Sequence, residues 1–268
     1  MNNGIVMNPE WSMLKMRVEC LRSKCADTVE VYMHAINIIG PNLKSLYMIN
    51  IGQYEYRLFQ LKIEICRWRR RFELRQRALN CGEKPDYIAI EDILEREFED
   101  YVRQSRERHE ALKKAALNMT QEVVSDEETT AIRMEYLKAV KKLHPDINPS
   151  LPDTAKELWN KIQKAYEDKD WVELKFLSAM ADDVLEGVQT CTCGDCIDEL
   201  RQEVIRLEDR LKEVYRRLNA LWGEEPYVWK DLFENDDEVR ARQNVFKKLI
   251  ESAEEKISLY ERRWKGER

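Results

Sequence analysis

Glycine and proline are scarce in this chain. Its 268 residues include only 8 glycines and 7 prolines, less than half of the roughly 12% that these two types contribute to average proteins. Sandwiches, barrels and doubly wound sheets need many tight turns, so this scarcity argues against them. The charged fraction of 36% and the hydrophobic fraction of 43% instead favour long amphipathic helices with one buried face. We therefore predict an all-α fold of long helices.

Long apolar runs are also missing. The most apolar stretches are interrupted by Glu30, His34, Asn37 and Asn50, and none approaches the roughly 18 uninterrupted residues that a membrane span requires. The first residues, MNNGIVMNPEWS, lack the basic start and apolar core of a secretory signal. Seven cysteines, an odd number, fit reduced thiols better than a disulfide framework. We expect a cytoplasmic protein without a membrane partner.

The charge balance gives little support to a nucleic-acid partner. The net charge is −6, from 45 basic and 51 acidic residues, so bulk electrostatics do not favour polyanions. An arginine-rich stretch, residues 67–77, could still contact phosphates. Its aromatic residues Trp68 and Phe72 belong to an apolar seam, however, and the next helix supplies balancing acids such as Glu91 and Glu97. Nucleic-acid binding is therefore the weaker interpretation.

Apolar residues recur every three or four positions in three long segments, residues 51–72, 197–221 and 239–264. This spacing is typical of helices that pack along a continuous seam. Gly223 and Pro226 separate the last two segments, and two such helices joined by a short irregular segment predict an antiparallel coiled-coil hairpin. A coiled coil can also join two copies of a chain, which would give a homo-oligomer.

Helix-ending signals divide the sequence into three consecutive regions. Gly82 and Pro85 end the first long helical stretch. We expect an N-terminal helical region over residues 1–86, a central region over residues 87–176, and a C-terminal helical region with the coiled-coil hairpin over residues 177–268.

The central region carries a cationic helix. Lys138, Lys141 and Lys142 stand at positions i, i+3 and i+4 and therefore share one face, while Arg133 lies further round the helix. The opposite side can pack against the helix that follows. The residues expected to form this apolar interface are Tyr136, Leu143, Trp159, Ile162, Ala165 and Tyr166.

The cationic helix ends at His144-Pro145-Asp146, because a proline disfavours helical conformation in the residue before it. A loop rich in proline and asparagine follows. No nucleophile adjoins His144, and only one carboxylate is fixed beside it, so the segment is a poor active site. We expect a docking surface, no catalytic residues and no enzymatic activity.

This segment resembles the J-domain (DnaJ) family of co-chaperones. The resemblance rests on His144-Pro145-Asp146, on Tyr136 eight residues before the histidine, on the basic helix, and on the pattern of the next helix, in which Trp159 replaces the usual phenylalanine. It implies a helical hairpin that engages a seventy-kilodalton heat-shock (DnaK-type) chaperone and stimulates its ATP hydrolysis. We expect this docking to use His144, Pro145, Asp146, Lys138, Lys141, Lys142 and Arg133.

The chain departs from the family pattern around this segment. The family's first helix has no clean equivalent in the residues NMTQEVV, so we expect the end of a helix over residues 90–118 to supply its packing. No Gly/Phe-rich linker and no repeated Cys-x-x-Cys-x-Gly-x-Gly module follows. The flanking helical regions are expected to bind a client or partner, whose identity the sequence leaves open. The alternative is a coiled-coil scaffold or adaptor with a vestigial J-like segment.

Three clustered cysteines allow a second alternative. Cys191, Cys193 and Cys196 could supply three thiolates to zinc. No histidine lies nearby to serve as the fourth ligand, which would have to come from Asp195, Asp198 or a second subunit. Three reduced cysteines in a turn are therefore the favoured interpretation. We expect no other cofactor.

Overall fold

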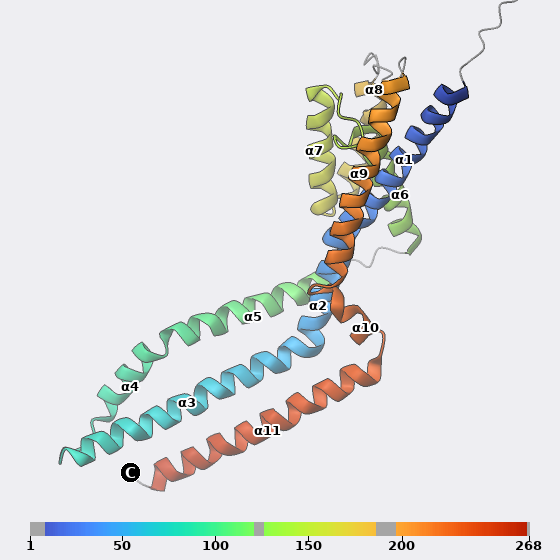
Figure 1. The fold of residues 1–268 in the computed structure, drawn as a ribbon. Helices are drawn as coiled ribbons and strands as arrows, with labels where there is room; N and C mark the ends of the chain where they lie inside the picture. Colours follow the sequence, from blue (N-terminus) through green and yellow to red (C-terminus); the bar gives the residue numbers. More distant parts are fainter. Residues whose placement is uncertain (1–8, 121–125, 186–196, 267–268) are drawn as a thin grey trace, which may run out of the picture. The chain divides into compact units, whose positions relative to one another are not determined.

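The computed structural model describes residues 9–120, 126–185 and 197–266, which form helices and loops without a strand (Figure 1). The predicted all-α fold is therefore confirmed. No helix within these described ranges is both long and apolar enough to cross a membrane. The helices are α1 (Pro9–His34), α2 (Gly40–Tyr47), α3 (Gln53–Asn80), α4 (Tyr87–Glu97), α5 (Glu99–Thr120), α6 (Asp126–Leu143), α7 (Asp153–Glu167), α8 (Trp171–Leu185), α9 (Ile197–Trp222), α10 (Lys230–Phe233) and α11 (Asp236–Gly266).

The first helix continues past the glycine and proline that could have ended it. A π-helical segment, Ala35–Ile39, leads directly into α2, which starts at Gly40. A proline in the first turn of a helix is tolerated because its missing N–H would have no partner there. Gly40 leaves room for Tyr227, since a Cβ at this position would lie 2.7 Å from the Tyr227 hydroxyl. That hydroxyl donates to the carbonyl of Ala35, 3.1 Å away.

The contacts group the chain into two compact units. Unit 1 comprises residues 1–41 and 124–227, and unit 2 comprises residues 42–123 and 228–268. Each unit thus combines an N-terminal segment with a C-terminal one. This grouping differs from three consecutive regions, because the long helices pair with partners far away in the sequence.

In unit 1, α9 packs along α1 (Figure 1). Glu10 pairs with Arg201 and Arg17 with Glu208, so the contacts follow the same order along both helices and the pair is parallel. The buried residues at this seam include, from both helices, Val18, Leu21, Cys25, Leu200, Leu207 and Val214.

In unit 2, α11 packs along α3. Leu58 and Leu61 of α3 form an apolar cluster with Ala253 and Ile257 of α11. The predicted antiparallel hairpin between residues 197–221 and 239–264 is not confirmed, because each of these helices packs on an N-terminal helix of its own unit. A heptad seam specifies that one face is buried but does not specify which helix buries it.

The predicted J-like helices lie in unit 1, where α6, α7 and α8 pack on one another and α6 also packs on α1. The helix over residues 90–118 was expected to supply this last packing. The structure instead divides it into α4 and α5, which contact α3 in unit 2. Val29 and neighbouring apolar side chains of α1 belong to the same buried cluster as α6 and α7. Helix α1 therefore provides the packing that was expected from the helix preceding α6 in the sequence.

Candidate docking site

The hairpin of α6 and α7 is built on stacked aromatic rings. Tyr136 and Tyr166 lie parallel, with ring centroids 4.0 Å apart, and Trp159 packs against Tyr136 at 5.8 Å. The Tyr136 hydroxyl is buried without a hydrogen-bond partner, and burial raises the pKa of this phenol. All the residues expected at the interface are buried in one cluster: Tyr136, Leu143, Trp159, Ile162, Ala165 and Tyr166.

A side chain from the loop caps the end of α6. Asn148 donates from Nδ2 to the carbonyl oxygens of Lys141 and Lys142, at 2.8 and 3.0 Å. The last carbonyls of a helix have no partner within it, so this contact satisfies two of them. Sequence reasoning missed this role, although asparagine is a frequent residue in such turns. The cap holds the loop against the helix that carries the tripeptide.

His144 is largely covered. Its side chain is 14% exposed, and its ring centroid lies 5.0 Å from that of Trp159. The backbone N–H of Asp146 donates to His144 Nδ1 at 3.1 Å. Burial lowers the pKa of His144, and the nearby Arg210 lowers it further, against the opposing effect of Asp146. The ring is therefore neutral, with Nδ1 as an acceptor.

Asp146 is more exposed but is not free. Its carboxylate accepts a hydrogen bond from Arg210, and its carbonyl oxygen accepts one from Arg206 Nη1 at 2.9 Å. Both arginines come from α9. Sequence reasoning missed them, because α9 was interpreted only through its apolar seam. Arg206 and Arg210 stand at positions i and i+4 and therefore share one face of α9. This spacing is the signal in the sequence that both could contact the same residue.

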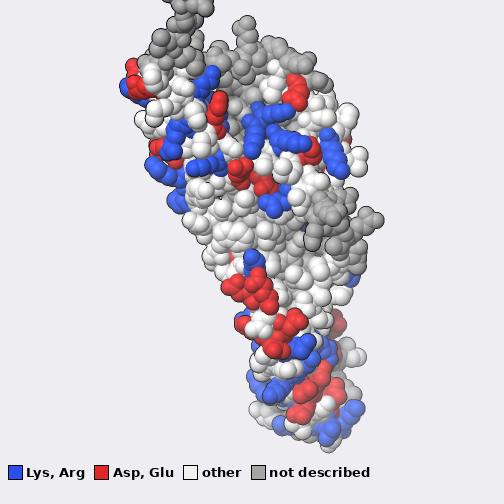
Figure 2. Space-filling view, turned by 90° about the vertical axis from the view of Figure 1, so that its right-hand side faces the viewer, with Lys and Arg blue, Asp and Glu red and all other residues white. Residues whose placement is uncertain are grey.

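Each of the four cations expected to dock a chaperone has an acidic neighbour. Lys138 pairs with Glu135 on its own helix, and Lys141 lies 3.4 Å from Asp27 of α1. The remaining pairs are Lys142 with Asp182 of α8 and Arg133 with Glu30 of α1. On the face drawn in Figure 2, basic and acidic side chains are interspersed over the described residues. The lysines therefore have acidic neighbours within the chain, but ion pairs between exposed side chains are weak.

Comparison with known families addresses this same segment. Residues 115–168 match the family described as DnaJ domain. The chain carries a DnaJ domain. Searches of curated proteins and of solved structures found no significant match. The matched residues begin within α5, but the helices that pack on α6 from outside the match are α1 and α8.

The arginine-rich stretch lies outside the DnaJ domain, on α3. Arg70 pairs with Glu97 and Arg71 with Glu91, at 2.8 and 2.6 Å. These are two of the acidic residues that were predicted to balance the arginines. Trp68 packs towards Trp264 of α11, with ring centroids 6.2 Å apart.

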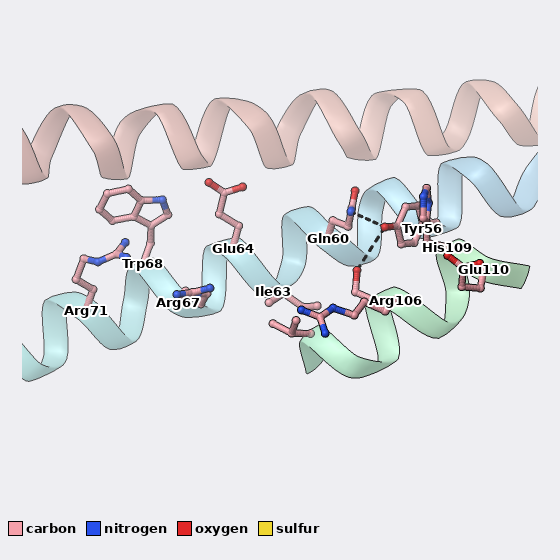
Figure 3. Close-up of a pocket in the computed structure, with 12 residues that line it drawn as sticks. Tyr56, Gln60, Ile63, Glu64, Arg67, Trp68, Arg71, Arg106, His109 and Glu110 are labelled. Carbon is pink, nitrogen blue, oxygen red and sulfur yellow. Dashed lines mark hydrogen bonds between the residues drawn. The ribbon is translucent and has the colours of Figure 1, made fainter. Parts of the chain in front are cut away.

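A groove of about 520 Å³ lies between α3 and α5 beside these arginines. Figure 3 shows Arg67 of α3 and Arg106 of α5 on its walls, together with Glu64 and Glu110. The groove therefore carries carboxylates as well as cations and does not present a purely cationic surface to phosphates.

The three possible zinc ligands lie between α8 and α9 in the sequence. Cys191, Cys193 and Cys196 lie outside the described residues. Within the described part of the chain, no cluster of three or more histidine, cysteine or acidic side chains could hold a metal ion.

Proposed function

We propose that this protein is a J-domain co-chaperone that binds a DnaK-type chaperone and stimulates its ATP hydrolysis. Proteins with a DnaJ domain are generally co-chaperones rather than enzymes. The observation that carries the proposal is an intact His144-Pro145-Asp146 at the end of α6 within the matched residues. The reaction takes place on the partner, so this chain needs no catalytic residue.

The geometry supports a docking role in two ways. Lys138 and Lys141 are exposed on α6, and exposed cations accelerate encounter with an acidic surface, an effect that weakens with salt. Pro145 and the Asn148 cap hold the tripeptide against the helix end, which lowers the entropic cost of binding. Binding that favours the hydrolysis-competent state of the partner accelerates its ATPase by population shift.

The regions outside the DnaJ domain are proposed to bind the client or a partner. Unit 2 offers the helices α3, α4, α5 and α11 for this purpose. The seams of α9 and α11 that could join two copies of the chain are filled here by α1 and α3. A homo-oligomer would therefore need another surface of these helices.

A single-turnover ATPase assay with the DnaK-type chaperone of the same organism tests the proposal. The parent protein should accelerate hydrolysis, and Asp146→Asn and His144→Gln should each remove this stimulation while the helical content stays unchanged. Asp153→Asn is the matched control, because Asp153 is a highly exposed aspartate at the start of α7. If the two tripeptide variants stimulate as well as the parent, the assigned roles are wrong.

A scaffold or adaptor with a vestigial J-like segment is the second candidate. The observation that favours it is that the expected docking cations and Asp146 all have partners within the chain. The same assay separates the two functions, because a scaffold would leave the hydrolysis rate of every DnaK-type partner unchanged.

A further inference from the structure

Two arginines of helix α9 contact the tripeptide at Asp146. These contacts can control whether a partner has access to the Asp146 carboxylate. We propose that Arg210 of α9 occupies the Asp146 carboxylate in a closed state, and that a DnaK-type partner must displace this arginine in order to dock. This inference rests on the proposed function and concerns the regulation of the same site.

Asp146 is held at both its side chain and its main chain. Arg210 donates to the carboxylate, and Arg206 donates to the carbonyl oxygen. Hydrogen bonds between a guanidinium and a carboxylate are about twice as strong as neutral ones. A carboxylate accepts and does not donate, and Arg210 donates to Oδ2 of Asp146, so a partner that recognises Asp146 through this oxygen competes with Arg210 for it.

The two arginines differ in how firmly they are held. Glu203 accepts hydrogen bonds from Arg206 Nε and Nη2, at 2.7 and 2.8 Å, and a third from Arg22 of α1 at 3.1 Å. Arg206 is therefore anchored to its own helix whether or not it contacts Asp146. Its bond to the main-chain carbonyl supports the loop without using the carboxylate.

Arg210 has no such anchor among the described residues. Within the described ranges its guanidinium pairs with Asp146, and its Nε is buried without a hydrogen-bond partner. The Asp146 side chain remains 42% exposed, so a partner can approach the carboxylate from the open side. Rotation of one side chain then suffices to release the site, while the apolar seam between α1 and α9 stays intact.

The cost to docking follows from the population of the open state. If only a fraction of molecules has the carboxylate free, the apparent dissociation constant increases by the inverse of that fraction. The Arg210–Asp146 pair is charge-assisted and partly exposed, and we expect it to raise the apparent dissociation constant for docking by about fivefold or more.

The experiment is a titration of DnaK-type ATPase stimulation by the parent protein and by Arg210→Gln. The variant should reach half-maximal stimulation at a concentration at least about fivefold lower, with the same maximum. Arg217→Gln is the matched control, since Arg217 lies on α9 and pairs with Glu213 of the same helix; it should behave as the parent. Arg210→Lys keeps a cation without the planar fork and should lie between the two, which also covers the case of a poorly folded glutamine variant.

The outcomes separate this inference from the proposed function. If Arg210→Gln stimulates as the parent does or less well, while the parent is active and Asp146→Asn is not, the closed state is refuted and the co-chaperone function stands. If neither the parent nor Arg210→Gln stimulates, the proposed function fails and the closed state fails with it. Stronger stimulation by Arg210→Gln that Asp146→Asn abolishes supports both.

Discussion

Glu30 of α1 and Arg133 of α6 form a bidentate ion pair, although they are 103 residues apart in the sequence. Arg133 donates from Nε and Nη2 to the two carboxylate oxygens, each at 2.9 Å. The Glu30 side chain is only 6% exposed, so Arg133 is the cation that compensates this buried carboxylate. Arg133 was expected among the docking cations, but its geometry joins α1 to the DnaJ domain.

Removal of the Arg133 charge should destabilise unit 1. Arg133→Gln leaves the Glu30 carboxylate buried without its cation, and we expect the free energy of unfolding to fall by about 2 kcal/mol. Urea denaturation measures this change. Lys138→Gln is the control, because Lys138 is exposed and its pair with Glu135 is worth well under about 1 kcal/mol. Glu30→Gln combined with Arg133→Gln should recover part of the loss; a double variant less stable than the single one would contradict this account.

The positions of the helices could be predicted from the sequence because their signals are local. Pro145 ends α6, and the apolar spacing from Tyr136 to Tyr166 gives the α6–α7 interface. The spacing in residues 51–72 likewise marks the face of α3 that is buried. Such signals depend only on residues within a few turns of each other.

The partners of the helices could not be predicted, because pairing depends on contacts between distant segments. The seam of α9 would fit any helix with a complementary apolar face, and α1 rather than α11 provides it. The same pairing brings Arg206 and Arg210 to Asp146. Without the α1–α9 packing, the sequence contains only two arginines one helical turn apart.

The stability of unit 1 should decrease as the pH falls. Burial lowers the pKa of His34, and Arg133 lowers it further against Glu30; burial and Arg210 likewise lower the pKa of His144 against Asp146. Both rings are therefore kept neutral in the folded state, whereas the unfolded chain takes up protons near the ordinary value of about 6.5.

The sign of the effect follows from this difference. The contribution of the two neutral rings is complete above about pH 6.5 and is lost as the pH falls below it, by up to roughly 1.4 kcal/mol per pH unit for each ring. Urea denaturation between about pH 7.5 and pH 5.5 measures the slope. His34→Gln with His144→Gln should flatten it, while His109→Gln, in unit 2, controls for the substitution itself. A slope unchanged by the double variant would show that carboxylates dominate.

The buried hydroxyl of Tyr136 should cost stability. It has no hydrogen-bond partner, and an unsatisfied buried polar group costs about 1–3 kcal/mol. Tyr136→Phe keeps the ring stacked on Tyr166 and should raise the free energy of unfolding by about 1 kcal/mol, as measured by urea denaturation. Tyr136→Ala, which also removes the ring, should instead lower it by roughly 3–5 kcal/mol. A loss of stability in the phenylalanine variant would mean that the hydroxyl has a partner.

The pairing of α3 with α11 should determine the stability of unit 2. Leu61 is 2% exposed and packs in the cluster with Ala253 and Ile257, so Leu61→Ala leaves a cavity at this seam and should cost roughly 2–4 kcal/mol. Leu79→Ala makes the same chemical change on the same helix at a side chain that is 45% exposed, and it should cost well under about 1 kcal/mol. Hydrogen exchange identifies the partner helix, because Leu61→Ala should reduce amide protection in α3 and α11 and leave α9 protected. If α9 lost amide protection instead, this result would favour the predicted hairpin of α9 with α11 over the pairing of α3 with α11.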